Sequence, residues 1–236
     1  MIRILVLICL ASPVLSETLR IGTEADFAPY MFHDETGALT GLDKDLGDAL
    51  CLSGGWDCTW IEADFASLVP GLMAGQFDII LAGMAITPGR MDLVDFTRPY
   101  ILTGQSIGVF AGLAADIPLQ TARIAVLSGS NQEAHLIKTG RDYIGLPTSG
   151  ACIDALIAGD VDLVFSTGSY LQSVLDNGLT DLQEVAREEF ASLGTAIAVE
   201  KGNIGLRDRL NTGLDAMRTD GRLQALVTKW LPNASE

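Results

Sequence analysis

The chain runs Asp78-Ile79-Ile80-Leu81-Ala82-Gly83-Met84-Ala85-Ile86-Thr87-Pro88-Gly89-Arg90, from an apolar strand that ends at a glycine, through a short link, into a helix. Thr87 is a good N-cap residue, and Pro88 suits the first helical position. Arg90 therefore falls in the first turn, where the helix dipole disfavours a cation. A carboxylate held between the guanidinium and free backbone amides would remove that conflict. The alternative is a surface arginine paired with Asp92 or Asp95.

Strands and helices alternate on both sides of this stretch. Strands are expected at 19–23, 59–62, 79–82, 124–127 and 163–166, and helices at 43–51, 67–74, 132–138, 153–158, 170–176, 206–217 and 223–230. Such alternation predicts an α/β fold with doubly wound, mostly parallel sheets. Two extended segments, 102–108 and 192–198, are expected to cross between two lobes. We predict lobe 1 from residues 17–103 plus 197–236, and lobe 2 from residues 104–196.

The first 16 residues have the pattern of a secretory signal peptide rather than of a folded element. Arg3 supplies the positive charge, residues 4–10 the apolar stretch, and Val14-Leu15-Ser16 a small-residue cleavage pattern. No later segment approaches about 18 uninterrupted apolar residues, the length that a transmembrane helix needs. We expect a soluble periplasmic protein whose mature chain begins at Glu17.

Charge and cysteine content narrow the function classes. The formal net charge is -15, one unit more negative without Arg3, which argues against nucleic acid and anionic membranes as partners. Such acidity suits a cationic ligand, although acidic surfaces also serve solubility. In an oxidising compartment Cys51 and Cys58 are expected to form a local disulfide, and Cys152 to be a buried free thiol. No cysteine and histidine spacing resembles a metal site, and no cofactor is expected.

Four blocks follow one another along the mature chain. They are Ile21-Gly22-Thr23-Glu24-Ala25-Asp26-Phe27-Ala28-Pro29-Tyr30, Ser67-Leu68-Val69-Pro70-Gly71-Leu72, the Arg90 block continued through Asp95-Phe96-Thr97-Arg98-Pro99-Tyr100, and Ile124-Ala125-Val126-Leu127-Ser128-Gly129-Ser130-Asn131-Gln132-Glu133. Together they resemble the bacterial family 3 extracellular solute-binding proteins, the periplasmic components of polar amino acid and opine ABC transporters. The cysteine pair is similar to that of the histidine and lysine/arginine/ornithine branch.

The resemblance implies a two-lobe periplasmic binding protein type II fold. It also implies a monomer that closes on a small ligand carrying a carboxylate and then meets an ABC transporter membrane permease. The implied ligand-binding positions are Glu24, Phe27, Phe65, Gly83, Ala85, Arg90, Leu127, Ser130, Asn131 and Thr167.

Each position has an implied role. Arg90 matches the arginine that grips the ligand α-carboxylate, which the backbone amides of Ala85 and Asn131 share. Phe27 and Phe65 match positions that sandwich the ligand side chain. Leu127 and Ser130 match positions that line the second lobe.

Glu24 matches an acidic position that faces a ligand ammonium or guanidinium. Two alternatives stay open at this point. Phe27 and Phe65 could be ordinary core residues, and Glu24 a solvated loop carboxylate.

Two residues depart from the family pattern. Ala85 stands where the family usually has Ser or Thr, and Thr167 stands where it usually has the aspartate that pairs with the α-ammonium. A buried ammonium without an anion costs several kcal/mol. We therefore expect a carboxylate whose amino group is absent, substituted or moved toward Glu24, such as an opine, a betaine or another amino acid derivative. The alternative is that Ser166, Ser169 or Glu24 takes over the missing role.

The expected function is reversible solute capture, not catalysis. A periplasmic cyclohexadienyl dehydratase is the enzymatic alternative, with Glu24 as its acid, but no second catalytic group is found. His33 and His135 stand in no nucleophile motif. The third alternative is a soluble sensor that presents its ligand to a receptor.

Overall fold

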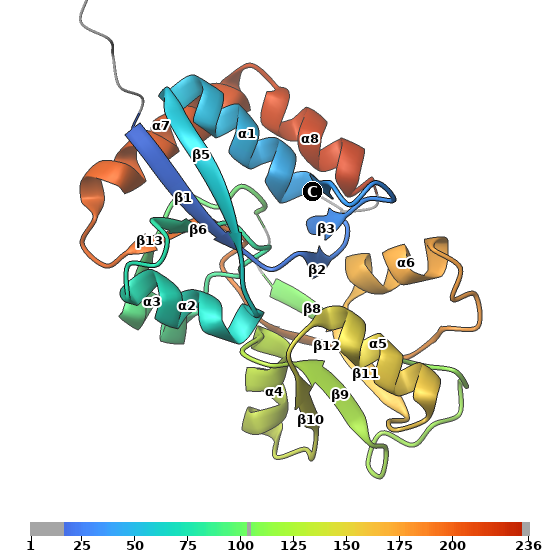
Figure 1. Ribbon diagram of the computed structural model, residues 1–236. Coiled ribbons are helices and arrows are strands. Elements are labelled where there is room, and N and C mark those ends of the chain that lie inside the picture. Colours follow the sequence, from blue (N-terminus) through green and yellow to red (C-terminus); the bar gives the residue numbers. More distant parts are fainter. Residues whose placement is uncertain (1–16, 103–104, 233–236) are drawn as a thin grey trace, which may run out of the picture.

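A computed structural model describes residues 17–102 and 105–232 and shows two α/β lobes, each built on a five-stranded sheet (Figure 1). The sheet of lobe 1 has the order β5-β1-β6-β13-β7, with bounds β5 (Trp56–Glu62), β1 (Glu17–Thr23), β6 (Ile79–Ile80), β13 (Ala198–Glu200) and β7 (Val94–Phe96). Within the described residues, no helix is long and apolar enough to span a membrane. The predicted signal peptide lies outside the described residues.

Helices cover both faces of the lobe 1 sheet. One layer contains α1 (Leu42–Gly54), α7 (Ile204–Thr219) and α8 (Arg222–Trp230), and the other contains α2 (Phe65–Met73) and α3 (Pro88–Leu93) (Figure 1). Side chains alternate across a strand, so Ile79 packs with the first layer and Ile80 with the second. Burial on both faces explains the continuous apolar run that marked this strand in the sequence.

Lobe 2 repeats this plan with the strand order β10-β9-β11-β8-β12. The strands are β10 (Ile144–Leu146), β9 (Ile124–Leu127), β11 (Leu163–Thr167), β8 (Gln105–Gly112) and β12 (Gln183–Ala191), and the helices are α4 (Asn131–Thr139), α5 (Ser149–Ala158) and α6 (Gly168–Asp176). In each sheet four strands share one direction and one is reversed. The reversed strands, β8 and β13, are those that the chain enters on passing from the other lobe.

The strand and helix pattern predicted from the sequence is present, with differences at several ends. A small sheet of β2 (Asp26–Phe27), β3 (Met31–His33) and β4 (Leu39–Thr40) was not predicted, because strands of two or three residues carry no readable alternation. The helix expected at 153–158 begins four residues earlier, where the Thr148 hydroxyl accepts from the Ala151 amide at 3.1 Å. The lobe boundaries at residues 103 and 197 stay a prediction.

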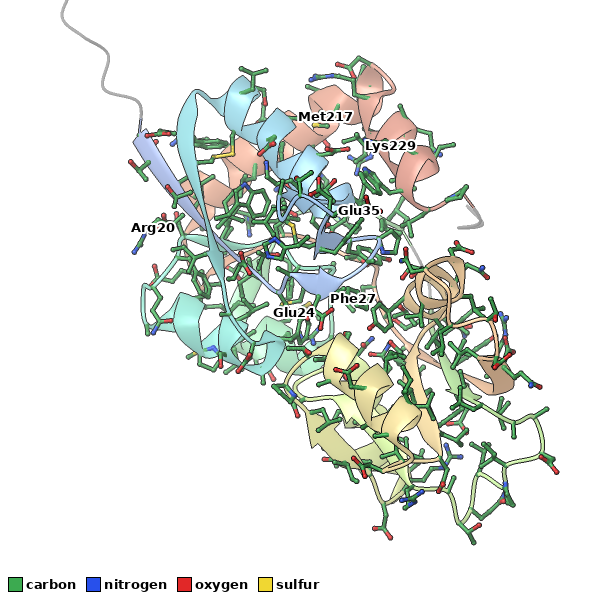
Figure 2. The ribbon with its side chains drawn as sticks, turned by 45° about the vertical axis from the view of Figure 1, so that its right-hand side comes forward. Arg20, Glu24, Phe27, Glu35, Met217 and Lys229 are labelled. Carbon is green, nitrogen blue, oxygen red and sulfur yellow. A yellow bond between two sulfur atoms is a disulfide. The ribbon has the colours of Figure 1, made fainter. Side chains whose placement is uncertain are left out.

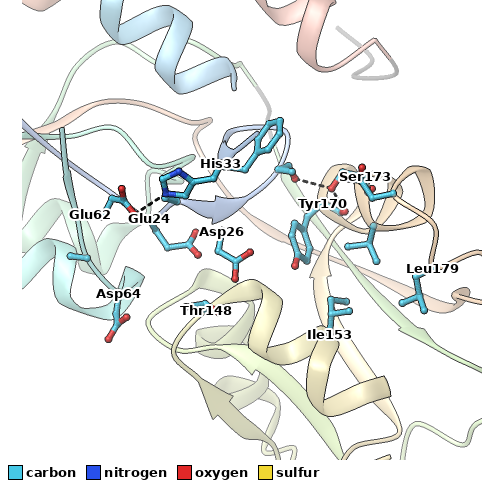
Figure 3. Close-up of a pocket in the computed structure, with 16 residues that line it drawn as sticks. Glu24, Asp26, His33, Glu62, Asp64, Thr148, Ile153, Tyr170, Ser173 and Leu179 are labelled. Atoms are coloured by element: carbon cyan, nitrogen blue, oxygen red, sulfur yellow. Dashed lines mark hydrogen bonds and ion pairs between the residues drawn. The ribbon is translucent and has the colours of Figure 1, made fainter. Parts of the chain in front are cut away.

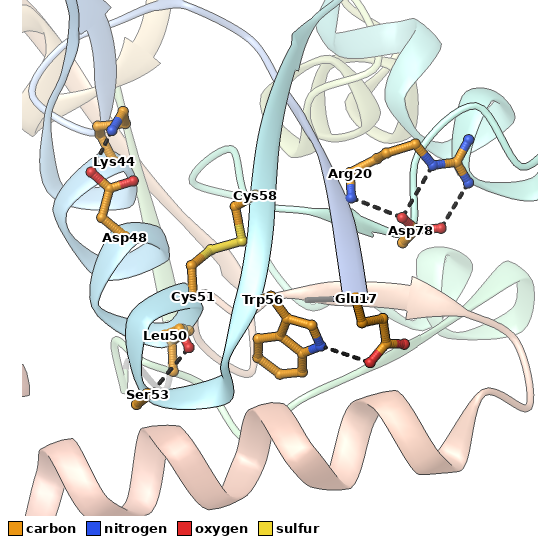
Figure 4. Close-up of a disulfide and its surroundings, with 10 residues drawn as sticks. All are labelled: Glu17, Arg20, Lys44, Asp48, Leu50, Cys51, Ser53, Trp56, Cys58 and Asp78. Carbon is orange, nitrogen blue, oxygen red and sulfur yellow. Dashed lines mark hydrogen bonds and ion pairs between the residues drawn. A yellow bond between two sulfur atoms is a disulfide. The ribbon is translucent and has the colours of Figure 1, made fainter. Parts of the chain in front are cut away.

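A disulfide joins Cys51 in α1 to Cys58 in β5 (Figure 4). Between the two cysteines, α1 continues to Gly54 and β5 begins at Trp56, so Gly55 alone links the helix to the strand. Gly55 has a φ of 70°, a conformation that glycine adopts without steric cost. Cys152 is a buried free thiol, as predicted.

Candidate functional site

A cavity of about 40 Å³ lies between the lobes, where the carboxyl ends of β6, β9 and β11 meet. Its walls are formed by Phe27, Phe65, Gly83, Ala85, Arg90, Leu127, Ser130, Asn131, Gln132, Phe165, Ser166 and Thr167. Nine of the ten predicted ligand-binding residues are in this set, and Glu24 is not. Pockets that hold small ligands usually measure roughly 300–1,000 Å³, so the side chains that line this cavity fill most of the space that a ligand would take.

Arg90 occupies the predicted position in the first turn of α3. Thr87 caps this helix and Pro88 is its first residue. The guanidinium donates from Nη1 to the Ala85 carbonyl at 2.8 Å and from Nη2 to the Gly129 carbonyl of lobe 2 at 2.9 Å. It also lies 5.2 Å from the centroid of the Phe65 ring.

The alternative pairing of Arg90 with a neighbouring aspartate is wrong. Asp95 instead pairs with Lys201 at 3.1 Å. Within the described residues, no carboxylate comes within ion-pair distance of Arg90. Burial lowers the pKa of Arg90 to about 10, because a guanidinium is less stable as a cation away from water. The site thus holds a cation whose neighbours are neutral.

Two helices of lobe 2 begin at the cavity wall. Ser130 caps α4 by accepting from the Glu133 amide at 3.0 Å, and Asn131 is the first residue of that helix. Thr167 caps α6 by accepting from the Tyr170 amide at 3.3 Å. Free amides at helix starts favour anions, so lobe 2 adds to the positive potential around Arg90.

The two predicted aromatic positions lie on the lobe 1 side of the cavity. Phe27 stacks between Tyr30 and Tyr170, with ring centroids 5.1 and 5.5 Å away. Because Tyr170 belongs to α6, this stack crosses the interface, and Figure 2 shows Phe27 at the junction of the lobes. Phe65 is the first residue of α2 and lies beneath the Arg90 guanidinium.

Glu24 lines a second, larger pocket of about 810 Å³ on the outer side of β2 (Figure 3). Phe27 faces the inner cavity, whereas its neighbours Asp26 and Ala28 line this outer pocket, so β2 separates the two. Four carboxylates gather there, from Glu24, Asp26, Glu62 and Asp64. Glu24 therefore lines the outer pocket, whereas the other nine predicted residues line the inner cavity.

Glu24 is buried, which overturns the alternative of a solvated loop carboxylate. It is 3 % exposed, and its Oε1 has no hydrogen-bond partner among the described residues. Burial raises the pKa of Glu24 to about 8, and the nearby Asp26 carboxylate adds to the rise, while the backbone amides of Asp26 and Ser149 oppose it. Ser149 begins α5, so the N-terminus of a lobe 2 helix faces this carboxylate.

Three cavity residues were not among the predicted set. Phe165 lies two positions before Thr167 on β11, so the alternation of a strand could have indicated it. Ser166 appeared only as a substitute for the missing ammonium partner. Gln132 had no sequence signal, since nothing in its local pattern marks a polar residue that is 6 % exposed.

Comparisons with known proteins agree with this architecture. The model of the bacterial extracellular solute-binding proteins, family 3, matches residues 19–233. An L-arginine-binding protein of Pseudomonas aeruginosa is 29% identical, with 89% of this chain and 86% of that protein covered. A putative ABC transporter arginine-binding protein 2 of Escherichia coli is 30% identical, with 93% of each chain covered.

The fold is also similar to that of a solved structure, a periplasmic His/Glu/Gln/Arg/opine family-binding protein from Silicibacter pomeroyi in complex with lysine. Its TM-score is 0.85 at 27% sequence identity, and the match covers 93% of this chain and 99% of that chain.

Proposed function

Because this chain belongs to the bacterial extracellular solute-binding proteins of family 3, we propose that it captures a small zwitterionic solute of the amino acid class between its lobes. The observation that carries the proposal is the Arg90 guanidinium, which is partly buried in the cavity wall and has no carboxylate partner among the described residues. A ligand carboxylate would supply the missing anion through a bidentate contact, worth roughly 1.5–3 kcal/mol net.

Glu24 supports a cationic group at the other end of the ligand. Its carboxylate is buried with one oxygen unpartnered among the described residues, so an ammonium or guanidinium would relieve the cost of its charge. Phe27 lines the inner cavity next to Asp26 of the outer pocket. Once freed from its stack with Tyr30 or Tyr170, its aromatic face would attract such a cation by about 0.5–2 kcal/mol. The ligand would thus run from Arg90 past Phe27 to Glu24.

A second candidate is an amino acid derivative without a free α-ammonium beside its carboxylate. The observation that favours it is the cavity wall, which contains Ala85, Ser166 and Thr167 but no acidic residue. A free α-ammonium would find only neutral oxygen atoms in this cavity. Opines, betaines and guanidino acids avoid that cost, because their nitrogen is substituted or lies farther from the carboxylate.

A thermal-shift panel separates the two candidates. The ligands are arginine, lysine, histidine and glutamine, their N-substituted derivatives, betaines, and polyamines as carboxylate-free controls. A ligand at 100 times its dissociation constant stabilises the protein by about 2.7 kcal/mol, an easily measured shift. Tight binding of an unmodified amino acid contradicts the derivative, and binding of polyamines alone contradicts the carboxylate anchor. Arg90→Ala should abolish the shift for every carboxylate ligand.

We propose that the chain serves an ABC importer from the periplasm. Residues 1–16 would direct its export, and a membrane permease would recognise the closed, liganded monomer. Turnover is the alternative to stoichiometric binding. Incubation with prephenate or arogenate, followed by absorbance, distinguishes them, because a binding protein leaves both compounds unchanged.

A further inference from the structure

Asp43 is a buried carboxylate with no role in the proposed ligand contacts. It is 0 % exposed, lies in the first turn of α1, and forms no ion pair among the described residues. A buried carboxylate without a cation is costly to the fold. Packing alone does not account for an aspartate at this position.

Three hydrogen bonds tie Asp43 to three separate segments. Its Oδ2 accepts from the Gly83 amide at 2.5 Å, and its Oδ1 accepts from the Tyr100 hydroxyl at 2.7 Å. Its own amide donates to the Tyr30 carbonyl at 2.8 Å. These segments are the link that leads to Arg90, the residues just before the first crossing, and the turn that follows Phe27.

Gly83 is where this network meets the ligand cavity. It lines the cavity and has a φ of 58°. A Cβ at this position would lie 3.0 Å from the Phe27 ring and 3.2 Å from the Tyr30 ring. The amide that Asp43 holds therefore belongs to a backbone turn packed directly under the aromatic wall.

Tyr100 is where the network meets the crossings. It is 4 % exposed, and its backbone amide donates to the Thr195 carbonyl of the second crossing at 2.8 Å. That second crossing pairs in turn with the Arg90 link, since the Ile86 amide donates to the Gly194 carbonyl at 2.8 Å. One carboxylate thus connects the cavity wall to both segments about which the lobes must move.

We propose that Asp43 is a positioning residue that holds the Gly83 amide and the Tyr100 hydroxyl in one arrangement, so that lobe closure on the ligand depends on its carboxylate. The inference rests on the proposed function and adds a residue that touches no ligand. Burial raises the pKa of Asp43 to about 7. The titratable groups that face it are Tyr30 and Tyr100, both neutral in that range because burial raises their pKa values as well.

The test compares Asp43→Leu with Asp43→Asn in the mature chain. L-arginine, L-lysine and N-substituted arginines serve as probes in calorimetry. Leu removes both acceptors, so affinity for the bound probe should fall about tenfold or more. Asn offers a carbonyl to Gly83 and an NH₂ group to the Tyr100 oxygen, so affinity should stay within about threefold of wild type.

Melting temperatures of the unliganded proteins distinguish a positioning role from a structural one. At pH 8 that of Asp43→Asn should equal or exceed the wild-type value, because this variant removes a buried negative charge and keeps both hydrogen bonds. That of Asp43→Leu should change little, because the same gain is offset by the two donors left without an acceptor. Asp45→Asn is the matched control on the same helix, where Asp45 accepts from Lys229 and Trp230 at 2.7 Å each. Asp45→Asn should lower the melting temperature and leave affinity unchanged.

A double variant tests whether Asp43 acts through Tyr100. Adding Tyr100→Phe to Asp43→Leu should cause no further loss of affinity.

Three results overturn the proposal. They are wild-type affinity in Asp43→Leu, equal loss of affinity in the Asn and Leu variants, and a melting temperature that falls in step with affinity. Hydrogen exchange of the unliganded proteins tests the role of Asp43 without relying on the identity of the ligand. Segments 80–86 and 97–102 should exchange faster in Asp43→Leu only, and unchanged exchange there also overturns the proposal. If wild type binds none of the probes, the proposed ligand class is contradicted, and the exchange measurement still tests the role of Asp43.

Discussion

At the scale of single residues, the site is defined by two ionisable groups that lack partners of opposite charge among the described residues. Arg90 is surrounded by carbonyls and an aromatic ring, and Glu24 by backbone amides and other carboxylates. Arg90 stays charged at neutral pH, whereas Glu24, with a pKa of about 8, is largely neutral there until a cation approaches. A ligand that carries both complementary groups would pair with Arg90 and stabilise the charged form of Glu24. Burial therefore makes closure around an empty cavity less favourable than closure around a ligand.

Glu24→Gln should flatten the pH dependence of stability in the unliganded protein. Burial raises the folded-state pKa of Glu24 from its ordinary value of 4.5 to about 8. A raised carboxyl pKa gives stability that is complete below the unfolded-state pKa and is lost as the pH rises through the folded-state pKa. Between pH 5 and pH 9, wild type should lose on the order of 3–5 kcal/mol more than the variant, as measured by urea unfolding.

Asp64→Asn is the control for this measurement. Asp64 is an exposed carboxylate that lines the same outer pocket. Its variant should keep most of the wild-type profile, because the Asp64 charge is the smallest of the contributions to the raised pKa of Glu24. Equal pH dependence in wild type and Glu24→Gln would show that the Glu24 carboxyl keeps its hydration in solution.

At the scale of helices and strands, local sequence predicted the elements that carry their own signals. Thr87 and Pro88 mark the start of α3, so the position of Arg90 could be predicted. The burial of Glu24 could not, because it depends on the start of α5, which lies more than a hundred residues later. The strand β12 was missed for another reason, since Glu184, Arg187 and Glu188 give it the composition of an exposed loop.

The disulfide between α1 and β5 should stabilise lobe 1 without affecting the site. The cysteines are seven residues apart, and closing a loop of that length is worth about 2–3 kcal/mol in the chain-entropy model. Cys51→Ala/Cys58→Ala should lose roughly that amount in urea unfolding and keep wild-type affinity. Cys152→Ala, which removes the buried free thiol, tests whether any cysteine loss has the same effect. A tenfold loss of affinity in the double variant would contradict this and show that ligand binding depends on the disulfide.

At the scale of the whole molecule, the two lobes meet through a few polar contacts around the cavity. Arg90 donates to the Gly129 carbonyl at 2.9 Å, and the Asp26 carboxylate accepts from the Gly150 amide at 2.9 Å. The Ser173 hydroxyl donates to the Ala28 carbonyl at 3.2 Å. Each bond joins a lobe 1 residue to a lobe 2 residue, so all of them must break when the lobes open for a ligand.

Gly129→Ala should block this closure. A Cβ on Gly129 would lie 2.8 Å from the Cα of Ala66 on α2 of the opposite lobe, closer than two packed carbon atoms can approach. The backbone of a helix cannot move aside locally, so the lobes must stay apart. Affinity for the ligand should fall at least about tenfold, and small-angle scattering with ligand present should give the larger radius of gyration of an open form.

Gly140→Ala is the control that distinguishes the steric block at Gly129 from the backbone strain that alanine causes at a glycine with positive φ. Gly129 and Gly140 have φ values of 76° and 68°, so alanine costs both roughly 1–2 kcal/mol of lobe 2 stability. A Cβ on Gly140 would meet no atom within 4 Å, because this residue ends α4 away from the interface. Gly140→Ala should therefore melt earlier yet close and bind as wild type does. Equal affinities for the two variants would mean that binding does not require the lobes to approach as closely as they do in this structure.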